Sequence, residues 1–122
     1  MTLRTIIELP DFETGHYEGC EFNMAKGDAL LVLHLSDLPD FRIQFRNVRW
    51  HRYTQLYSCD VSMIKDAYFR VIEVSSTELL ESFLESDRSD PSQRAYKELH
   101  HFRIFLDETG CHEVLAESAF AS

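Results

Sequence analysis

Six histidines are the residues best suited to metal chemistry, because a neutral imidazole is the commonest metal ligand in proteins. They are His16, His34, His51, His100, His101 and His112. Their spacings form no HxH or HExxH motif, and no pair stands four residues apart beside an acid on a predicted helix. His101 and His112 fall on the two arms of a predicted hairpin, where they either face each other or are ordinary surface histidines. The sequence therefore predicts no metal and no cofactor, with this one pair left open.

Three cysteines, Cys20, Cys59 and Cys111, are the candidate thiol nucleophiles. No CxxC pair is present, which argues against a zinc ribbon or a dithiol redox site. Neighbouring side chains of a strand point to opposite faces, so Cys111 and His112 are not expected to form a catalytic pair. The chain also lacks a GxSxG motif and a glycine-rich phosphate loop. No catalytic residue is therefore predicted, which favours a protein that is not an enzyme, with Cys59 and Cys111 as unreactive thiols.

A local excess of positive charge gives the first candidate binding site. The segment 41–53 contains four arginines and no acidic residue, interleaved with aromatic side chains. Arginine binds phosphate and carboxylate groups in a forked geometry, and aromatic rings stack on planar ligands. The candidate site for a small anionic ligand, or for an enzymatic reaction, consists of Arg42, Arg46, Arg49, Trp50 and His51. The alternative is that these arginines pair with acidic side chains across a sheet.

A local excess of negative charge gives the second candidate. The segment 71–90 contains six acidic residues and one basic residue. Three of the acids, Glu78, Glu81 and Glu85, fall on the solvent side of a predicted amphipathic helix. They form either one side of an interface with a basic partner protein or a solvated helix face.

Strand patterns dominate the elements that must position these residues. We predict strands over 17–24, 29–35, 41–53, 68–74, 99–106 and 112–119, the first two and the last two being hairpins. Phe41, Ile43 and Phe45 alternate with polar residues, but the apolar phase then slips by one residue. The slip predicts a β-bulge near Arg46 and Asn47, or a tight turn at the same place.

One helix is predicted over 76–86. Ser75 and Glu78 fit a capping box, and Leu79, Leu80, Phe83 and Leu84 form one apolar stripe. The segment 60–67 is either one helical turn or a loop, and a short turn is expected to begin at Asp90 before Pro91.

These elements predict an α+β fold in a single domain, residues 1–122. The fold is a mostly antiparallel, meandering sheet of about six strands with the helix 76–86 packed on it. The strands that begin at Phe41 and Leu99 are expected to share that sheet. In the last hairpin Phe102, Ile104 and Leu106 should point inward, with His101, Arg103 and Phe105 pointing outward.

Composition limits the class of protein. The 122 residues include 12 Lys and Arg against 21 Asp and Glu, a net charge of −9 that argues against a nucleic-acid binder. The N-terminus is too acidic for a signal peptide, and the longest strongly apolar run, 29–33, is far too short to span a membrane. Cysteines that are few and odd in number favour a reducing compartment. We expect a cytoplasmic protein without membrane contact, either a monomer or a homodimer joined through a strand edge.

Three segments carry a resemblance to known proteins: YFRVIEVSS at 68–76, LHHFRIF at 99–105 and EVLAES at 113–118. They resemble small bacterial proteins of unknown function, some of them similar in layout to toxin-neutralising immunity proteins. That layout is a strand, a capped helix, a histidine-bearing strand and a closing strand, and it covers about the last 50 residues. Thr77 and Glu78 depart from it where a tryptophan is more typical. The resemblance transfers no catalytic residue.

Charge, the lack of a catalytic motif and the acidic helix together favour a non-catalytic acidic binding protein of immunity or adaptor type. Its partner would be a basic protein, because an acidic surface complements a basic one. The alternative function is the anionic-ligand or enzymatic site in 41–53.

Overall fold

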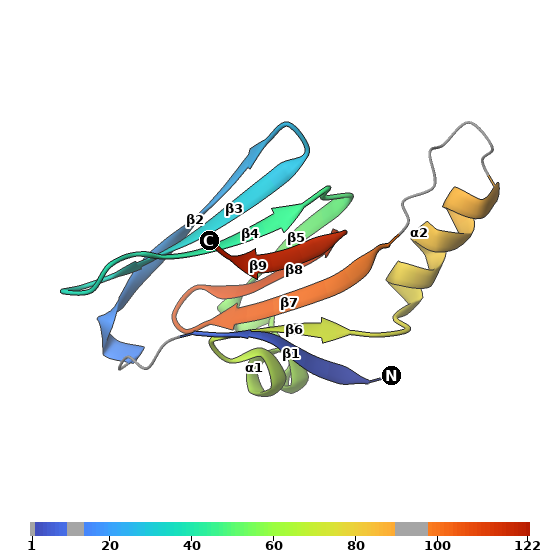
Figure 1. Ribbon diagram of the computed structural model, residues 1–122. Coiled ribbons are helices and arrows are strands. Elements are labelled where there is room, and N and C mark those ends of the chain that lie inside the picture. Colours follow the sequence, from blue (N-terminus) through green and yellow to red (C-terminus); the bar gives the residue numbers. More distant parts are fainter. Residues whose placement is uncertain (1, 10–13, 90–97) are drawn as a thin grey trace.

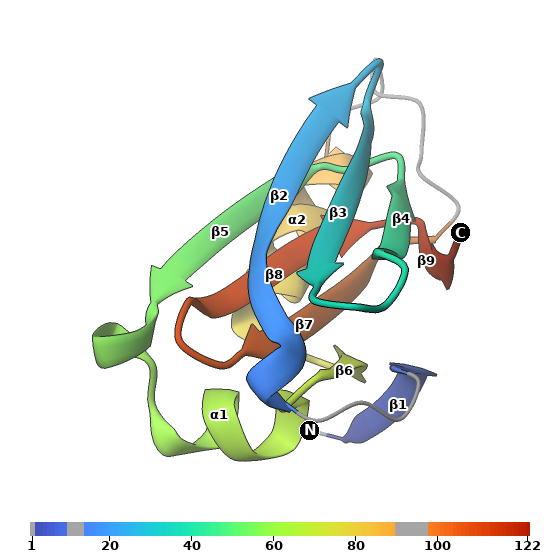
Figure 2. The same cartoon turned by 90° about the vertical axis from the view of Figure 1, so that its left-hand side faces the viewer.

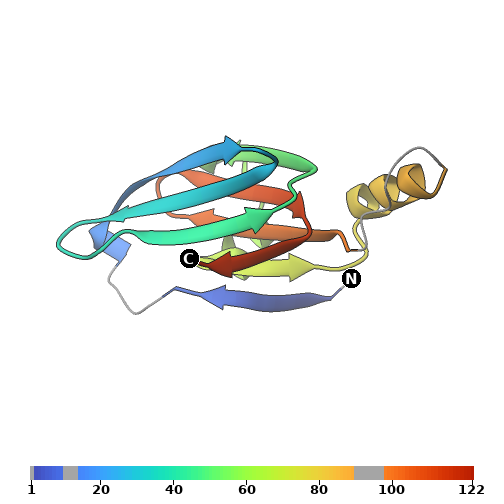
Figure 3. The same cartoon turned by 45° about the horizontal axis from the view of Figure 1, so that its top comes forward.

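The chain folds into two antiparallel β-sheets that pack face to face, with helices on one outer face (Figure 1). The computed structural model describes residues 2–9, 14–89 and 98–122. The five-stranded sheet has the spatial order β1 (Leu3–Glu8), β6 (Arg70–Val74), β7 (His100–Leu106), β8 (Gly110–Ala116) and β5 (Trp50–Gln55). The four-stranded sheet has the order β2 (Tyr17–Ala25), β3 (Asp28–Leu35), β4 (Phe41–Arg46) and β9 (Ser118–Ala121). Figure 3 shows the four-stranded sheet lying over the five-stranded one.

The molecule is β-rich and antiparallel as predicted, but the prediction of one sheet with about six strands is wrong. Among the described residues there are nine strands in two sheets. The N-terminal strand β1 was not predicted, and two predicted strands are each divided, into β4 with β5 and into β8 with β9. The strands that begin near Phe41 and Leu99 therefore lie in different sheets.

The predicted slip in phase near Asn47 is a corner where the chain passes from one sheet to the other. Asn47 has a φ of 51°, a left-handed conformation that asparagine tolerates. Two successive amides then bond to different sheets: Val48 N–H donates to Gly27 O at 2.7 Å, and Arg49 N–H donates to Leu115 O at 2.8 Å. The residues around Asn47 therefore lead the chain from one sheet to the other. A bulge within one ladder or a tight turn would have kept the two strands in the same sheet.

The main hydrophobic core lies between the two sheets. It includes Leu31, Leu33, Ile43 and Phe45 from the four-stranded sheet and Phe102, Ile104, Leu106 and Val114 from the five-stranded sheet. The alternation in 41–45 and 99–106 therefore predicted correctly which side chains point into this core.

The expected turn between β7 and β8 is also present. Gly110 has a φ of 148°, and a Cβ there would lie 2.2 Å from Thr54 O. Only glycine fits that position.

Two helices cover the outer face of the five-stranded sheet at opposite ends (Figures 1 and 2). The helix α1 (Val61–Ala67) covers a cluster that includes Ile72, Phe105 and Cys111. The helix α2 (Glu78–Ser89) covers a cluster that includes Leu99 and Leu115. His101 and Phe105 point outward as predicted, but this cover leaves them only 3% and 1% exposed. No helix among the described residues has the length and apolar character needed to cross a membrane.

The starts of the two helices differ from the prediction. The main helix begins at Glu78, and its cap is Thr77, whose Oγ1 accepts from Leu80 N–H at 3.2 Å. The predicted cap, Ser75, instead accepts from Thr2 N–H at 3.1 Å, because Ser76, with a φ of 58°, turns the chain after β6. The segment 60–67 is helical, with Asp60 as the N-cap. The short turn expected at Asp90 lies outside the described residues.

Candidate functional site

The corner separates the five residues of the predicted anionic-ligand site. Arg42 and Arg46 lie on β4 in the four-stranded sheet, where Arg46 rests over the Phe120 ring at 5.2 Å. Trp50 and His51, adjacent on β5, point to opposite faces of the five-stranded sheet. The structure therefore does not bring the five side chains to one place.

Two arginines of this segment pair with acids, but only one of them does so across a sheet, as the alternative interpretation held. Arg49 forms a bidentate ion pair with Asp87 of α2, with N–O distances of 2.7 and 2.9 Å. The hydrogen bonds and charge of Arg49 lower the pKa of Asp87. Arg52 pairs with Glu113 across the sheet at 2.9 Å. The first pair fastens α2 to the corner, and the second belongs to a larger network.

That network is a line of three charged side chains across the outer face of the five-stranded sheet, which we call the ionic row: Arg52, Glu113 and Arg103. In the strand register Arg52 and Arg103 both lie directly opposite Glu113. Glu113 is 1% exposed. Its Oε1 accepts from Arg52 and its Oε2 accepts from Arg103 Nη2 at 3.2 Å. Burial raises the pKa of Glu113, but the hydrogen bonds from His101 and Arg52 and the charge of Arg103 outweigh it and lower the pKa to about 2.

His101 connects the ionic row to the start of α2. Its Nε2 lies 2.7 Å from Glu113 Oε2, and its Nδ1 lies 2.9 Å from Thr77 Oγ1. A neutral imidazole satisfies every contact: Nε2–H donates to Glu113, and the Thr77 hydroxyl donates to Nδ1. The Thr77 oxygen remains free to accept from Leu80 N–H, so one hydroxyl both caps the helix and holds the histidine.

The predicted alternative in which His101 faces His112 is wrong. The register pairs His101 with Leu115 and His112 with Ile104, which places the two imidazoles on opposite faces of the sheet. A hairpin centred on its turn pairs residues by equal distance from that turn, and these two histidines are not equidistant. Among the residues that the structure describes, no group of three or more His, Cys, Asp or Glu is arranged to hold a metal ion.

On the inner face, His112 forms a second polar cluster with Cys20 and His51. His112 Nδ1 lies 3.1 Å from His51 Nε2, and His112 Nε2 lies 3.7 Å from Cys20 Sγ. Burial and the nearby charge of His51 lower the pKa of His112 to about 4, and burial lowers the pKa of His51. Both imidazoles are therefore neutral at pH 7. A base this weak does not take the proton of a thiol, so Cys20 and His112 lack the electrostatics of an activated pair.

The other two thiols are held in their protonated form. Cys111 is fully buried, and burial raises its pKa to about 12. Burial also raises the pKa of Cys59. Neither thiol has the lowered pKa that a nucleophile requires.

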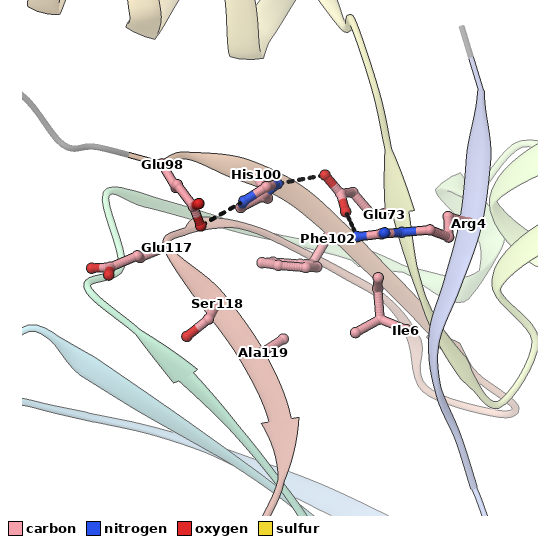
Figure 4. A pocket seen from close by; sticks show the side chains of 9 residues that line it. All are labelled: Arg4, Ile6, Glu73, Glu98, His100, Phe102, Glu117, Ser118 and Ala119. Atoms are coloured by element: carbon pink, nitrogen blue, oxygen red, sulfur yellow. Dashed lines mark hydrogen bonds and ion pairs between the residues drawn. The ribbon is translucent and has the colours of Figure 1, made fainter.

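A cavity of about 170 Å³ opens between the sheets at the end near α2 (Figure 4). Its lining consists of Arg4, Ile6, Glu73, Glu98, His100, Phe102, Glu117, Ser118 and Ala119. Glu73 accepts from Arg4 Nη2 at 2.8 Å and lies 2.5 Å from His100 Nδ1. Burial raises the pKa of Glu73, but these two partners outweigh it and the pKa is lowered. The lining thus contains three carboxylates, one guanidinium and several apolar side chains. Such a lining suits a cationic group at the end of an apolar chain, as in a lysine or arginine side chain.

The predicted partner-binding acids lie on the solvent face of α2. Glu78, Glu81 and Glu85 are exposed, and none forms an ion pair with another described residue. The strand β6 leads into this helix and β7 begins beside it, so the helix and the cavity share one end of the molecule (Figure 1). We call this region the acidic end, defined by Glu73, Glu78, Glu81, Glu85, Glu98 and Glu117.

Comparison with models of protein families, with curated protein sequences and with solved structures finds no match in any of the three.

Sequence reasoning missed the pairing of Arg103 with Glu113, although a signal for it was present. Arg103 lies four residues before the turn 107–109 and Glu113 four residues after it, which places them opposite each other in a regular hairpin. The cluster of Arg4, Glu73 and His100 had no such signal. Arg4 and Glu73 are 69 residues apart, and no local pattern joins β1 to β6.

Proposed function

We propose that the chain is a non-catalytic acidic binding protein of the immunity or adaptor type, whose acidic end binds a basic surface of a partner protein. The observation that carries this proposal is the gathering, at one end of the molecule, of α2 carboxylates without an ion-pair partner among the described residues and of a cavity whose lining includes three further carboxylates. These groups come from α2, β6, the bend between β8 and β9, and the segment that leads into β7, so the fold, not the sequence order, collects them.

The electrostatics favour a basic partner. With a net charge of −9, the chain attracts cationic surfaces at long range. At the acidic end, the cavity lies in a concave surface with low-dielectric walls, where the field of its carboxylates is concentrated. A lysine or arginine of the partner meets both charge and apolar surface there, as at the centre of a specific interface.

The buried and half-buried polar clusters support a role in folding more than one in catalysis. Glu113 has hydrogen bonds from three side chains, and Glu73 has two partners. The buried thiol has a raised pKa and the buried imidazole beside Cys20 has a lowered one, which is the reverse of an activated nucleophile and base. Rigid internal ion pairs of this kind fix the geometry of a binding surface.

The test is a comparison of two charge-matched variants in affinity capture from the native host. One carries Glu78→Lys, Glu81→Lys and Glu85→Lys on α2. The other carries Glu8→Lys, Glu18→Lys and Asp66→Lys, three acids outside the acidic end that also lack a described ion-pair partner. Both variants have the same net charge, so a difference between them reports position.

We expect a basic protein to be captured by the wild type and by the second variant, and its recovery to fall at least about tenfold with the α2 variant, since several steered ion pairs are reversed. Equal recovery with both variants would show that α2 is not the binding face. Capture of no basic protein by the wild type would remove the proposal.

A further inference from the structure

The ionic row lies in the strip of sheet left between the two helices. On one side is the cluster under α1, with Phe105 and Cys111, and on the other the cluster under α2, with Leu115. Arg52, Glu113 and Arg103 are consecutive in the strand register between them. A sheet face that only needed covering would continue the apolar surface, so the three charged side chains call for another explanation.

Both arginines have N–H groups to spare. Arg52 uses Nη2 on Glu113, and its Nε and Nη1 have no hydrogen-bond partner among the described residues. Its side chain is 54% exposed. Arg103 uses Nε and Nη2 on Glu113, which leaves Nη1, and it is 14% exposed. A guanidinium has five N–H donors, so each side chain can bind a second anion without releasing the first.

The row also has excess positive charge. Two guanidinium groups face one carboxylate, and His101 adds no negative charge. Of the nearby acids, Asp60 interacts with the charge of Arg103, but its Oδ1 accepts from Met63 N–H and from the Ser62 hydroxyl, and both oxygens of Asp87 bind Arg49. In a chain of net charge −9, two arginines that share one hydrogen-bonded carboxylate are a local exception.

We infer that Arg52 and Arg103 form a binding site for a phosphate-class oxyanion, either free phosphate or the phosphate of a small monoester. Because two oxygens of one carboxylate bind both guanidinium groups, these groups are close enough together for two oxygens of one phosphate, which have a similar spacing, to bridge their remaining N–H groups. Glu113 acts as a positioning residue, because its carboxylate binds both guanidinium groups and accepts hydrogen bonds from three side chains. The Arg52 guanidinium lies over the Trp50 ring, 5.4 Å from the ring centroid, and this cation–π contact helps to orient it.

This arrangement provides its own reporter, because Trp50 is the single tryptophan of the chain. A ligand that takes up Arg52 changes the charge over the indole and therefore its fluorescence. The experiment is a titration with inorganic phosphate, and separately with glycerol phosphate, at ionic strength held constant with sodium chloride. We expect a saturable change with half-saturation at about 1 to 10 mM, the affinity that two charge-assisted pairs supply.

The matched variants are Arg52→Gln and Arg46→Gln. Arg46 is an exposed arginine that rests on an aromatic ring in the other sheet, so its loss changes net charge equally without touching the ionic row. We expect Arg52→Gln to abolish the saturable change and Arg46→Gln to retain it. Arg52→Lys keeps the charge but loses the fork, and we expect about tenfold weaker binding from it.

A linear response to phosphate that chloride reproduces would overturn the inference. So would equal weakening by Arg46→Gln, which would indicate a general charge effect. If Arg52→Gln does not fold, an unchanged half-saturation in Arg52→Lys would still count against the site. Tighter binding of glycerol phosphate than of phosphate would identify a monoester as the ligand, and the reverse order would identify the free ion. The titration needs no partner protein, so its outcome is independent of the function proposed for the acidic end.

Discussion

Individual buried polar residues in this molecule are kept in opposite charge states by their surroundings. Glu113, on the outer face of the five-stranded sheet, is surrounded by donors and keeps its negative charge. His112, on the inner face and adjacent in sequence, is surrounded by aromatic rings and a second imidazole and remains neutral. The alternation of a strand places the two in environments of opposite character although one peptide bond joins them.

His112 predicts a loss of stability in mild acid. Its pKa is about 4 in the folded state against 6.5 for an unperturbed histidine, so the unfolded chain binds the proton first as the pH falls. This contribution to stability is complete above pH 6.5 and is lost between pH 6.5 and about 4. We expect the free energy of unfolding to fall by about 2 kcal/mol from pH 7 to pH 5, measured by urea denaturation, and His112→Phe to remove most of that fall.

His34 provides the control, because its pKa is shifted the other way. The hydrogen bond to Asp40 raises the pKa of His34, so it favours the folded state in acid and loses that effect as the pH rises. We therefore expect His34→Gln to keep the acid loss or to steepen it slightly. A His112→Phe profile parallel to that of the wild type would contradict the assignment of the acid loss to His112.

At the residue scale, a pairing of side chains was open to prediction only where a regular local geometry links the two partners, and even the pair so linked was missed. Arg103 and Glu113 are related by the hairpin, and Arg52 meets Glu113 because β5 adds to the other side of β8. That second pairing depends on where the corner at Asn47 sends the chain. Likewise, the contact of Cys20 with His112 crosses from one sheet to the other, and sequence spacing has no bearing on it.

Among the elements, α2 shows how one hydroxyl joins a helix to a sheet. Thr77 Oγ1 accepts from Leu80 N–H and also bonds to the buried His101, which in turn donates to Glu113. Loss of this hydroxyl would leave a helix amide and a buried ring nitrogen without partners. We expect Thr77→Val to lower the free energy of unfolding by about 2 kcal/mol, the sum of a lost cap and a lost buried hydrogen bond, measured by urea denaturation.

Two further variants make this prediction specific. Thr77→Ser keeps the hydroxyl and should remain near the wild type. Ser75→Ala removes the residue that the sequence pattern favours as the cap, but its contacts to Thr2 are exposed, so we expect a cost of about 0.5 kcal/mol. An equal cost for Ser75→Ala and Thr77→Val would contradict the structural assignment of the cap.

The elements were more predictable than their assembly. Alternation and turn residues predicted the β2–β3 and β7–β8 hairpins, because the forces that form them act within one local segment. The division into two sheets was not predicted, since a strand that crosses a corner has the same apolar content on both sides. The helix α1 was left open because its apolar residues, Met63 and Ile64, are only half-buried and give little periodic signal.

For the whole molecule, the distribution of charge matters more than its total. Exposed acids occur over much of the surface, for example Glu8, Glu18 and Asp37, but they are scattered. At the acidic end, the carboxylates of α2 share one end of the molecule with a cavity whose lining includes three more. Net charge sets the attraction of a cationic ligand at long range, whereas the placement of these carboxylates determines where the ligand binds.

A short cationic peptide should therefore dock at the acidic end. The probe is hexa-arginine, titrated into the isotope-labelled protein at low salt while backbone amide shifts are recorded by NMR. We expect the largest shifts around Glu73, Glu81, Glu98 and Glu117. These shifts should be lost at about 0.5 M salt, where the Debye screening length is only a few ångströms. The double variant Glu98→Gln and Glu117→Gln should reduce them, while Glu8→Gln and Glu18→Gln, equal in charge, should not. Shifts spread evenly over the scattered acids would mean that net charge alone attracts the peptide, and the acidic end would then have no special affinity for a basic partner.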